Sequence, residues 1–140
     1  MKKVYRSIEL EELFFYTLYN FNAYWEIGTV SSEVACRISN RTGYDTNQYS
    51  IRLYNTELKH ILARHFFETN QAQRNVCFED MKKFDVIINQ PTTISNGNKE
   101  NSIVFTKYLS FVNEQVVLVA EIDRRKKIML VKTCWIKRKK

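Results

Sequence analysis

The spacing of hydrophobic residues changes near Asn101, and this change constrains the fold more than any other feature of the chain. Before it, apolar residues recur at the three- and four-residue intervals typical of amphipathic helices. After it come three runs rich in Val, Ile, Phe, Thr and Tyr with the period of two typical of strands. These runs are Ser102 to Leu109, Gln115 to Ile122 and Lys127 to Ile136.

The connections between the three runs are short and polar, which favours an antiparallel meander because a parallel crossover needs a dozen or more residues. Helices followed by strands predict an α+β domain in which the N-terminal helices pack on one face of the C-terminal antiparallel sheet. The other face is expected to stay open. The chain length predicts one compact unit, and the sequence resemblance described below, which begins at Val30, divides it into an N-terminal aromatic element, residues 1–29, and a main domain, residues 30–140.

Capping residues and helical spacing predict four helices. The first has Ser7 as N-cap and stops by Gly28, and the second starts at Ser31 or Ser32 and ends before Gly43. The third has Thr56 as N-cap, and the fourth runs from about Glu79 to Asn89 with Pro91 beyond it. The residues expected to face inward are Leu10, Leu13, Phe14, Leu18 and Phe21, then Val34, Ala35 and Ile38, then Leu58, Ile61, Leu62 and His65, then Met81, Phe84, Ile87 and Ile88.

Aromatic side chains crowd the N-terminal element. The simplest explanation is a helix that buries one face against the rest of the domain. A surface that stacks on a ligand or binds another protein is the alternative. The residues concerned are Phe14, Phe15, Tyr16, Tyr19, Phe21, Tyr24 and Trp25.

Positive charge is concentrated at the C-terminal end. The chain has 22 Lys and Arg against 15 Asp and Glu, a net charge of +7, yet the last 17 positions hold nine basic residues and no acidic one. This asymmetry favours a polyanionic partner, either nucleic acid or an anionic membrane surface. Arg124 to Lys127 fall in a predicted turn between strands, whereas Lys137 to Lys140 form a true tail that could simply be solvated.

Scarce glycine and scattered cysteine exclude several classes of protein. The three glycines are too far apart for a dinucleotide or Walker phosphate loop. Cys36, Cys77 and Cys134 form no CxxC pair, so neither a disulfide framework nor a zinc knuckle is indicated, and a reducing, intracellular setting fits best. There is no signal-like segment and no apolar run of about 18 residues, so we expect a soluble protein.

Both histidines lie in the stretch HILARH and are candidates for proton transfer near neutral pH. Residues five apart do not share one face of a straight helix, so one of His60 and His65 is expected to be catalytic and the other structural. His65 falls on the apolar arc, where a core histidine is the alternative. The spacing does not match the zincin motif, so we expect no metal and no other cofactor.

Polar and aromatic residues interrupt two of the predicted strands. Lone strand lysines usually face solvent, but cations and aromatic rings on neighbouring strands are the combination that binds single-stranded RNA. The residues are Thr106, Lys107 and Tyr108 in one strand and Lys132, Thr133 and Trp135 in another.

The order of these segments resembles the phage-associated nuclease domains of the barnase, EndoU, colicin and RelE-like superfamily. The similarity covers Val30 to Ile136 and is carried by TGYDTNQYSIRLYNTELKHILARH, NVCFEDMKKFDVIINQP, NSIVFTKYL, VVLVAEI and LVKTCWI. It implies an α+β domain and a metal-independent endoribonuclease that acts on tRNA or mRNA, in the cytoplasm of a host cell or in association with a virion. No membrane partner is implied.

The resemblance also assigns roles to individual residues. The histidine-helix motif falls on His60, Arg64 and His65, the strand lysine on Lys107 and the closing Lys-Thr motif on Lys132 and Thr133, while Phe66 stands where a glycine is common. The predicted reaction is attack of the RNA 2′-hydroxyl on its own phosphate. We predict His60, His65, Lys107 and Thr133 as catalytic and Arg64, Tyr108, Lys132, Trp135, Arg124 and Arg125 as RNA-binding.

Two other functions stay open. A protein with the nuclease fold could hold RNA or a protein without cutting it. The chain could also be a phage structural or interaction protein that binds a phage or host protein through its N-terminal aromatic helix.

Overall fold

The computed structural model describes residues 6–19, 22–69, 72–138 of the chain. Phe21, Lys139 and Lys140, which the sequence analysis singled out, lie outside the described residues. The side chains of Tyr16, Leu18 and Tyr19 are likewise not described. In the described parts, no helix is long and apolar enough to cross a membrane.

The three predicted strands form the antiparallel meander, which confirms that part of the expected fold. They are β6 (Ser102–Leu109), β7 (Glu114–Asp123) and β8 (Ile128–Arg138). A short edge strand that was not predicted, β5 (Thr93–Asn96), pairs antiparallel with β6. The short turns between the runs let each strand fold back directly on its predecessor.

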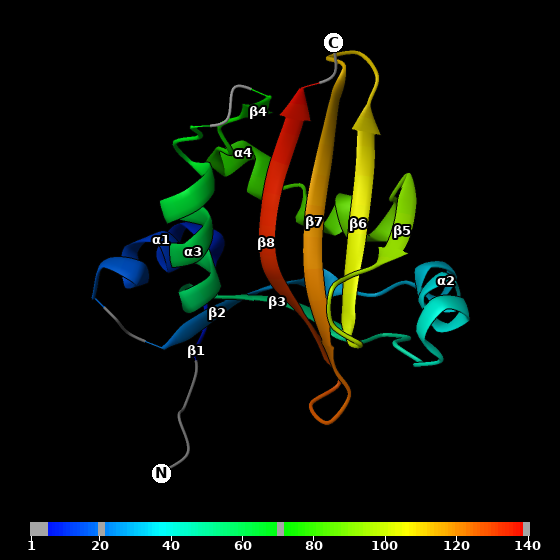
Figure 1. Cartoon of the computed structure of the whole chain (residues 1–140). Coiled ribbons are helices and arrows are strands. Elements are labelled where there is room, and N and C mark those ends of the chain that lie inside the picture. The colour runs from blue at the N-terminus through cyan, green and yellow to red at the C-terminus, as the bar shows by residue number, and fades with distance from the viewer. Residues whose placement is uncertain (1–5, 20–21, 70–71, 139–140) are drawn as a thin grey trace.

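The sheet extends beyond the meander on the side of β8. There β3 (Ser50–Tyr54) runs parallel to β8, followed by β2 (Ala23–Thr29) and β1 (Arg6–Ser7), so the order is β1-β2-β3-β8-β7-β6-β5. The short β4 (Gln73–Arg74) pairs with the other end of β8. The sheet is therefore mixed, and Figure 1 shows its strands twisting steeply between β3 and β8.

The described residues form five helices, one more than predicted, and several boundaries differ from the prediction. They are α1 (Leu10–Tyr19), α2 (Ser32–Thr42), α3 (Asn55–His65), α4 (Phe78–Met81) and α5 (Phe84–Asn89). The predicted fourth helix is broken at Lys82 and Lys83, although its inward-facing residues Met81, Phe84, Ile87 and Ile88 are all buried. The contacts place α3 along β8, α5 against β6 and β7, and α2 against β5, so a single layer of helices on one sheet face is not confirmed.

The first helix was predicted too long. It ends at Tyr19, and Tyr24 and Trp25 belong to β2, because aromatic residues fit a strand as well as a helix. Gly28 is therefore not a helix stop. A Cβ atom there would lie 3.0 Å from the Asp85 carboxylate, so glycine allows the close approach of α5 to β2.

Local capping agrees with the prediction for α2 and not for α3. The Ser31 hydroxyl accepts a hydrogen bond from Val34 N (3.3 Å), and Gly43 ends α2 at φ 77°. Thr56 is not the N-cap of α3, because the helix already begins at Asn55. The buried Asn55 side chain instead accepts a hydrogen bond from Ala23 N (3.3 Å), which ties the start of α3 to β2.

The two faces of the meander differ in burial. The core face of β6, β7 and β8 is almost fully covered, and burial raises the pKa of the Cys134 thiol on it. The opposite face, called here the open face, carries the half-buried or exposed residues Val104, Thr106, Tyr108, Val119, Thr133 and Trp135, together with Val117, which is buried. The residues buried on the core face are Ile103, Phe105, Leu118, Ala120, Met129, Val131, Cys134 and Ile136.

Candidate active site

A groove of about 340 Å³ lies on the open face between the start of α3 and the middle of β8. Three of the predicted site residues, His60, Lys132 and Thr133, line it together with Thr56 and Glu57. The registers of β3 and β4 explain why a groove can form here. They pair with residues 128–130 and 136–137 of β8, so α3 rather than a strand lies beside the stretch between.

The α3 helix presents two polar side chains to this groove. Glu57 and His60 are three residues apart and so share one face of the helix. Leu58 and Ile61 lie on another face and are fully buried, which fixes how the helix is rotated. Packing of the apolar residues therefore aims the polar pair at β8.

A β-bulge in β8 supplies the other wall. Val119 pairs with Thr133 and Ala120 with Val131, which leaves Lys132 as an extra residue. Val131 and Cys134 are both buried on the core face although they are three residues apart, so the bulge directs both Lys132 and Thr133 away from the core. A regular strand would have placed adjacent residues on opposite faces.

Two carboxylates hold the Lys132 ammonium group. Its Nζ lies 3.2 Å from Glu57 Oε1 and 4.0 Å from Glu121 Oε2. An ammonium group has three N–H donors, so two carboxylates leave one donor to spare. The Thr133 hydroxyl oxygen beside it is buried and has no hydrogen-bond partner among the described residues. A cation and an unpaired hydroxyl thus adjoin in one groove.

The surroundings of His60 favour its neutral form. Partial burial, then Arg64 and His65, lower the pKa of His60 below its ordinary value of 6.5, against the opposing effect of Glu57. His60 is nevertheless exposed to solvent. A neutral, accessible imidazole can accept a proton at pH 7.

His65 lies further along α3 and does not line the groove. Its ring centroid is 6.1 Å from that of Trp135, and its Nδ1 contacts Glu68 Oε1. His60 and His65 are five residues apart in α3, which corresponds to a rise of about 7.5 Å along the helix. Thr133 and Trp135 are two residues apart in β8, which corresponds to about 6.6 Å along the strand. The two histidines therefore face successive open-face positions of β8, His60 beside Thr133 and His65 beside Trp135. The two rings therefore have different surroundings.

The structure does not bring Lys107 to the groove. Lys107 pairs with Val116, on the same face as the buried Ile136, and its Nζ donates a 2.6 Å hydrogen bond to Gln90 O at the end of α5. Tyr108 lies on the open face but near the far end of β6, where its hydroxyl donates to Asn113 Oδ1 at 2.7 Å. The pleat of β6 separates the two residues.

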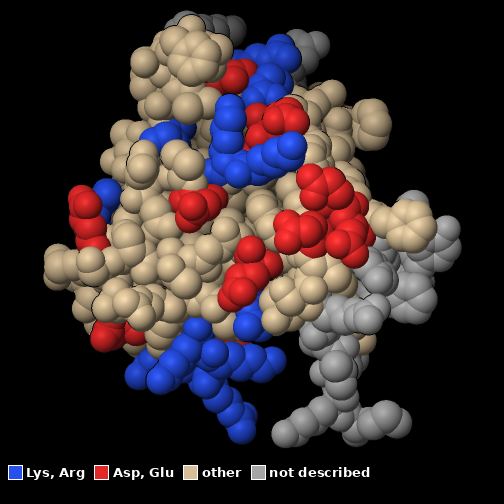
Figure 2. Space-filling model, turned by 180° about the vertical axis from the view of Figure 1, so that it is seen from behind, with Lys and Arg blue, Asp and Glu red and all other residues tan. Residues whose placement is uncertain are grey.

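The basic turn between β7 and β8 lies at one end of the open face. Arg124 and Arg125 are exposed there, and the Arg124 guanidinium lies 4.5 Å from the centroid of the Tyr44 ring. Figure 2 shows Lys and Arg side chains gathered at the end of the molecule where this turn lies in Figure 1. A smaller hollow of about 170 Å³ joins Lys126 of the turn to Thr56 and Glu57. The hollow thus shares two residues with the candidate active site.

Sequence reasoning missed Glu57, Thr56 and Lys126. Glu57, in the first turn of α3, was not among the predicted site residues. Its spacing of three from His60 was the signal that could have placed it in the site.

Among the described residues, no cluster of three His, Cys, Asp or Glu side chains is arranged to hold a metal ion.

Comparison with known families identifies the class of protein. Residues 29–140 match the family model described as phage-Barnase-EndoU-ColicinE5/D-RelE like nuclease3. The chain belongs to this family of nuclease-like domains, as its sequence resemblance predicted. No curated protein and no solved structure matches the chain significantly.

Proposed function

We propose that this protein is a metal-independent endoribonuclease whose active site is the groove between α3 and β8. The observation that carries the proposal is the convergence of His60, Lys132 and Thr133, from two separate elements, in one groove. A proton acceptor, a cation and a hydroxyl donor are the groups that phosphoryl transfer without a metal requires. The family supports a nuclease-like activity.

The proposed reaction is transesterification. Neutral His60 removes the proton from a ribose 2′-hydroxyl, and the 2′-oxygen attacks the adjacent phosphorus. The bond from phosphorus to the 5′-oxygen breaks, and the leaving oxygen takes a proton from water. One product ends in a 2′,3′-cyclic phosphate and the other in a 5′-hydroxyl. General base catalysis of this kind contributes about 10² to 10⁴-fold in rate.

Lys132 and Thr133 act on the phosphate. The ammonium group stabilises the negative charge that develops on the phosphorane, and the Thr133 hydroxyl, buried and unpaired in the free protein, rotates toward the groove and donates to a non-bridging oxygen. Glu57 fixes the position of Lys132 through their 3.2 Å ion pair. Trp135, one open-face position beyond Thr133, offers a ring on which a base can stack.

The test is incubation of the purified protein with tRNA and mRNA in EDTA, followed by analysis of the new RNA ends. We expect cleavage that leaves 2′,3′-cyclic phosphates. Intact RNA would contradict the proposal, as would cleavage that leaves 3′-hydroxyl ends, because those ends require a different nucleophile.

A further inference from the structure

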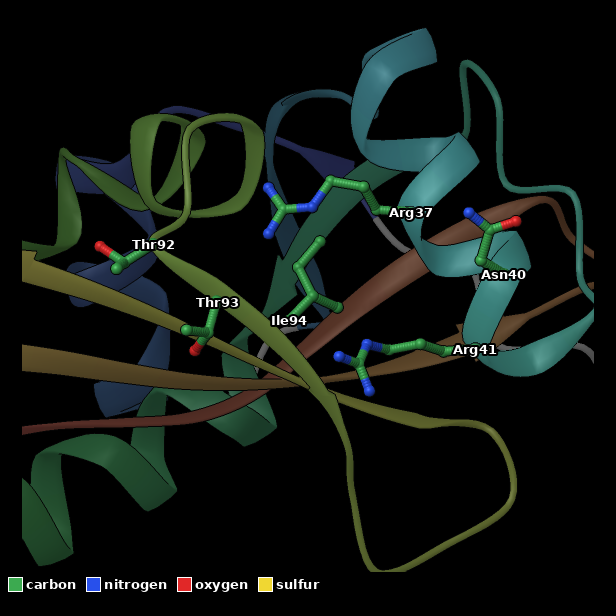
Figure 3. A pocket seen from close by; sticks show the side chains of 6 residues that line it. All are labelled: Arg37, Asn40, Arg41, Thr92, Thr93 and Ile94. Carbon is green, nitrogen blue, oxygen red and sulfur yellow. The ribbon is translucent and has the colours of Figure 1, made fainter.

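A second hollow lies at the β5 edge of the sheet, three strands away from the β8 wall of the candidate active site. It measures about 520 Å³ and separates α2 from the edge strand β5. Figure 3 shows Arg37 and Arg41 extending from α2 toward β5. Asn40, Thr92, Thr93 and Ile94 complete the lining.

The two arginines bring two positive charges close together. They are four residues apart and project from one face of α2, where like charges repel. Neither makes an ion pair with an acidic residue in the part of the chain that the structure describes, whereas Arg74 and Lys132 are both paired. Arg41, in the last turn of α2, can interact with the helix dipole, but Arg37 lies too far from the helix end for that. The pair is thus suited to an anion from outside the chain.

One row of open-face residues connects this hollow with the candidate active site. Thr93 lines the hollow and pairs with Thr106, which pairs with Val117, which pairs with Trp135. Their side chains share the open face because directly paired residues point the same way. Four adjacent strands place the ends of the row about 14 Å apart, a distance that a few nucleotides span.

We infer that the hollow between α2 and β5 binds a backbone phosphate of the same RNA strand that the groove cleaves. The arginines hold a phosphate that lies several nucleotides from the cleaved bond. The RNA between that phosphate and the cleaved bond crosses the row of residues from Trp135 to Thr93. This inference rests on the proposed function for the cleaved end of the strand. The hollow itself binds RNA whether or not the RNA is cut.

The experiment compares the wild-type chain with the double variant Arg37→Gln/Arg41→Gln. Fluorescence anisotropy measures the affinity for a labelled single-stranded RNA of about ten nucleotides over a range of salt concentrations. We expect affinity to fall about tenfold or more, and the slope of log affinity against log salt to decrease in magnitude by about 0.7 for each phosphate that the variant no longer neutralises. Cleavage efficiency is measured on the same RNA and on a dinucleotide, and the reduction should be larger for the longer RNA.

Lys82→Gln/Lys83→Gln is the matched control, because it also removes two positive charges, here from the exposed α4–α5 link. Unchanged affinity and salt slope in the arginine variant would overturn the inference, and so would equal reductions in both double variants. If wild-type protein cuts no RNA but the arginine variant alone binds RNA more weakly, the proposed function fails and the phosphate site stands.

Discussion

His60 is the residue on which the proposed chemistry depends. Partial burial, Arg64 and His65 hold its pKa below 6.5, so the ring is neutral and able to accept a proton at pH 7. Because the active form is the deprotonated one, kcat/KM should rise with pH and level off above an apparent pKa lower than 6.5.

Replacement of Arg64 tests this electrostatic account. Arg64 lowers the pKa of His60, so Arg64→Gln should move the rising limb of the pH profile toward higher pH. The measurement is kcat/KM for RNA cleavage across the acid range, with Lys82→Gln as a control on charge. A limb that does not move in Arg64→Gln would contradict the assignment of that limb to His60.

The two strand lysines should behave differently. Lys132 lines the groove, so Lys132→Ala should lower kcat by about 10² to 10³. Lys107 lies on the other side of the sheet, so Lys107→Ala should retain near wild-type kcat in protein shown by circular dichroism to be folded. If Lys107→Ala lowered kcat more than Lys132→Ala did, the catalytic cation would be Lys107, as the family resemblance predicts, and not Lys132, as the groove indicates.

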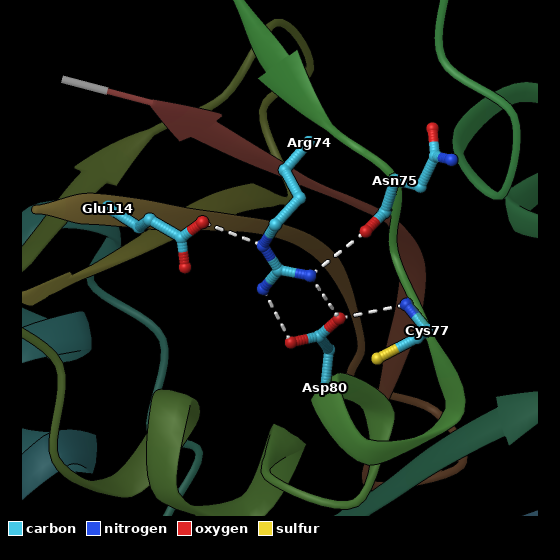
Figure 4. A network of polar contacts seen from close by, with 5 residues as sticks. All are labelled: Arg74, Asn75, Cys77, Asp80 and Glu114. Atoms are coloured by element: carbon cyan, nitrogen blue, oxygen red, sulfur yellow. Dashed lines mark hydrogen bonds and ion pairs between the residues drawn. The ribbon is translucent and has the colours of Figure 1, made fainter. Parts of the chain in front are cut away.

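At the scale of single elements, a polar network fixes the loop that follows α3. The Arg74 guanidinium binds both Asp80 carboxylate oxygens (2.8 and 3.0 Å) and Glu114 Oε2 (2.7 Å), and Asp80 Oδ2 accepts from Cys77 N (2.8 Å). Figure 4 shows how these contacts join β4, α4 and β7. Arg74, whose pKa the network raises, is its centre.

Removal of one charge should destabilise the fold. Asp80→Asn should lower the free energy of unfolding by about 1 to 3 kcal/mol, measured by urea denaturation, because it breaks a charged hydrogen-bond pair that is mostly buried. Glu79→Gln is the matched control. The Glu79 side chain is 73% exposed, so this change should cost less than about 0.5 kcal/mol.

The effect of Asp80→Asn should depend on pH in a defined direction. Burial alone would raise the pKa of Asp80, but hydrogen bonds from Arg74 and Cys77 outweigh it and hold the pKa below 3.8. The stabilisation is therefore present above pH 3.8 and is lost as pH falls through the lower folded-state value. A difference between wild type and variant that persisted in strong acid would contradict this account.

Local sequence patterns predicted the elements whose signals are strong. The period of two identified β6, β7 and β8, and Ser31 with Gly43 delimited α2. The β3 strand was missed although Ile51 and Leu53 alternate with polar residues, because five residues directly before a helix give little signal. Its parallel pairing with β8 joins segments far apart in the chain, which no local pattern specifies.

The same limit applies to the site. Residue type singled out His60, Lys132 and Thr133 and the resemblance gave them roles, but the face that a strand residue occupies depends on register. The bulge in β8 places the neighbours Lys132 and Thr133 in the same groove. The pleat of β6 directs Lys107 to the other face of the sheet.

For the whole molecule, the segment before the matched family region takes part in the sheet. Leu10, Leu13 and Ala23 are buried, and β2 pairs with β3 along five residue pairs. A chain that starts at Val30 should therefore lose cooperative unfolding, because it exposes the edge of β3 and part of the core. A cooperative denaturation curve for that shortened chain would instead support an independent domain of residues 30–140.

The measurement that tests the central claim most directly is single-turnover cleavage of end-labelled RNA in EDTA by wild-type protein and by His60→Ala. We predict that wild-type protein leaves a 2′,3′-cyclic phosphate and that His60→Ala binds the same RNA but cuts it about 10² to 10⁴-fold more slowly. Cleavage by His60→Ala at the wild-type rate would contradict the assignment of the active site to the groove between α3 and β8.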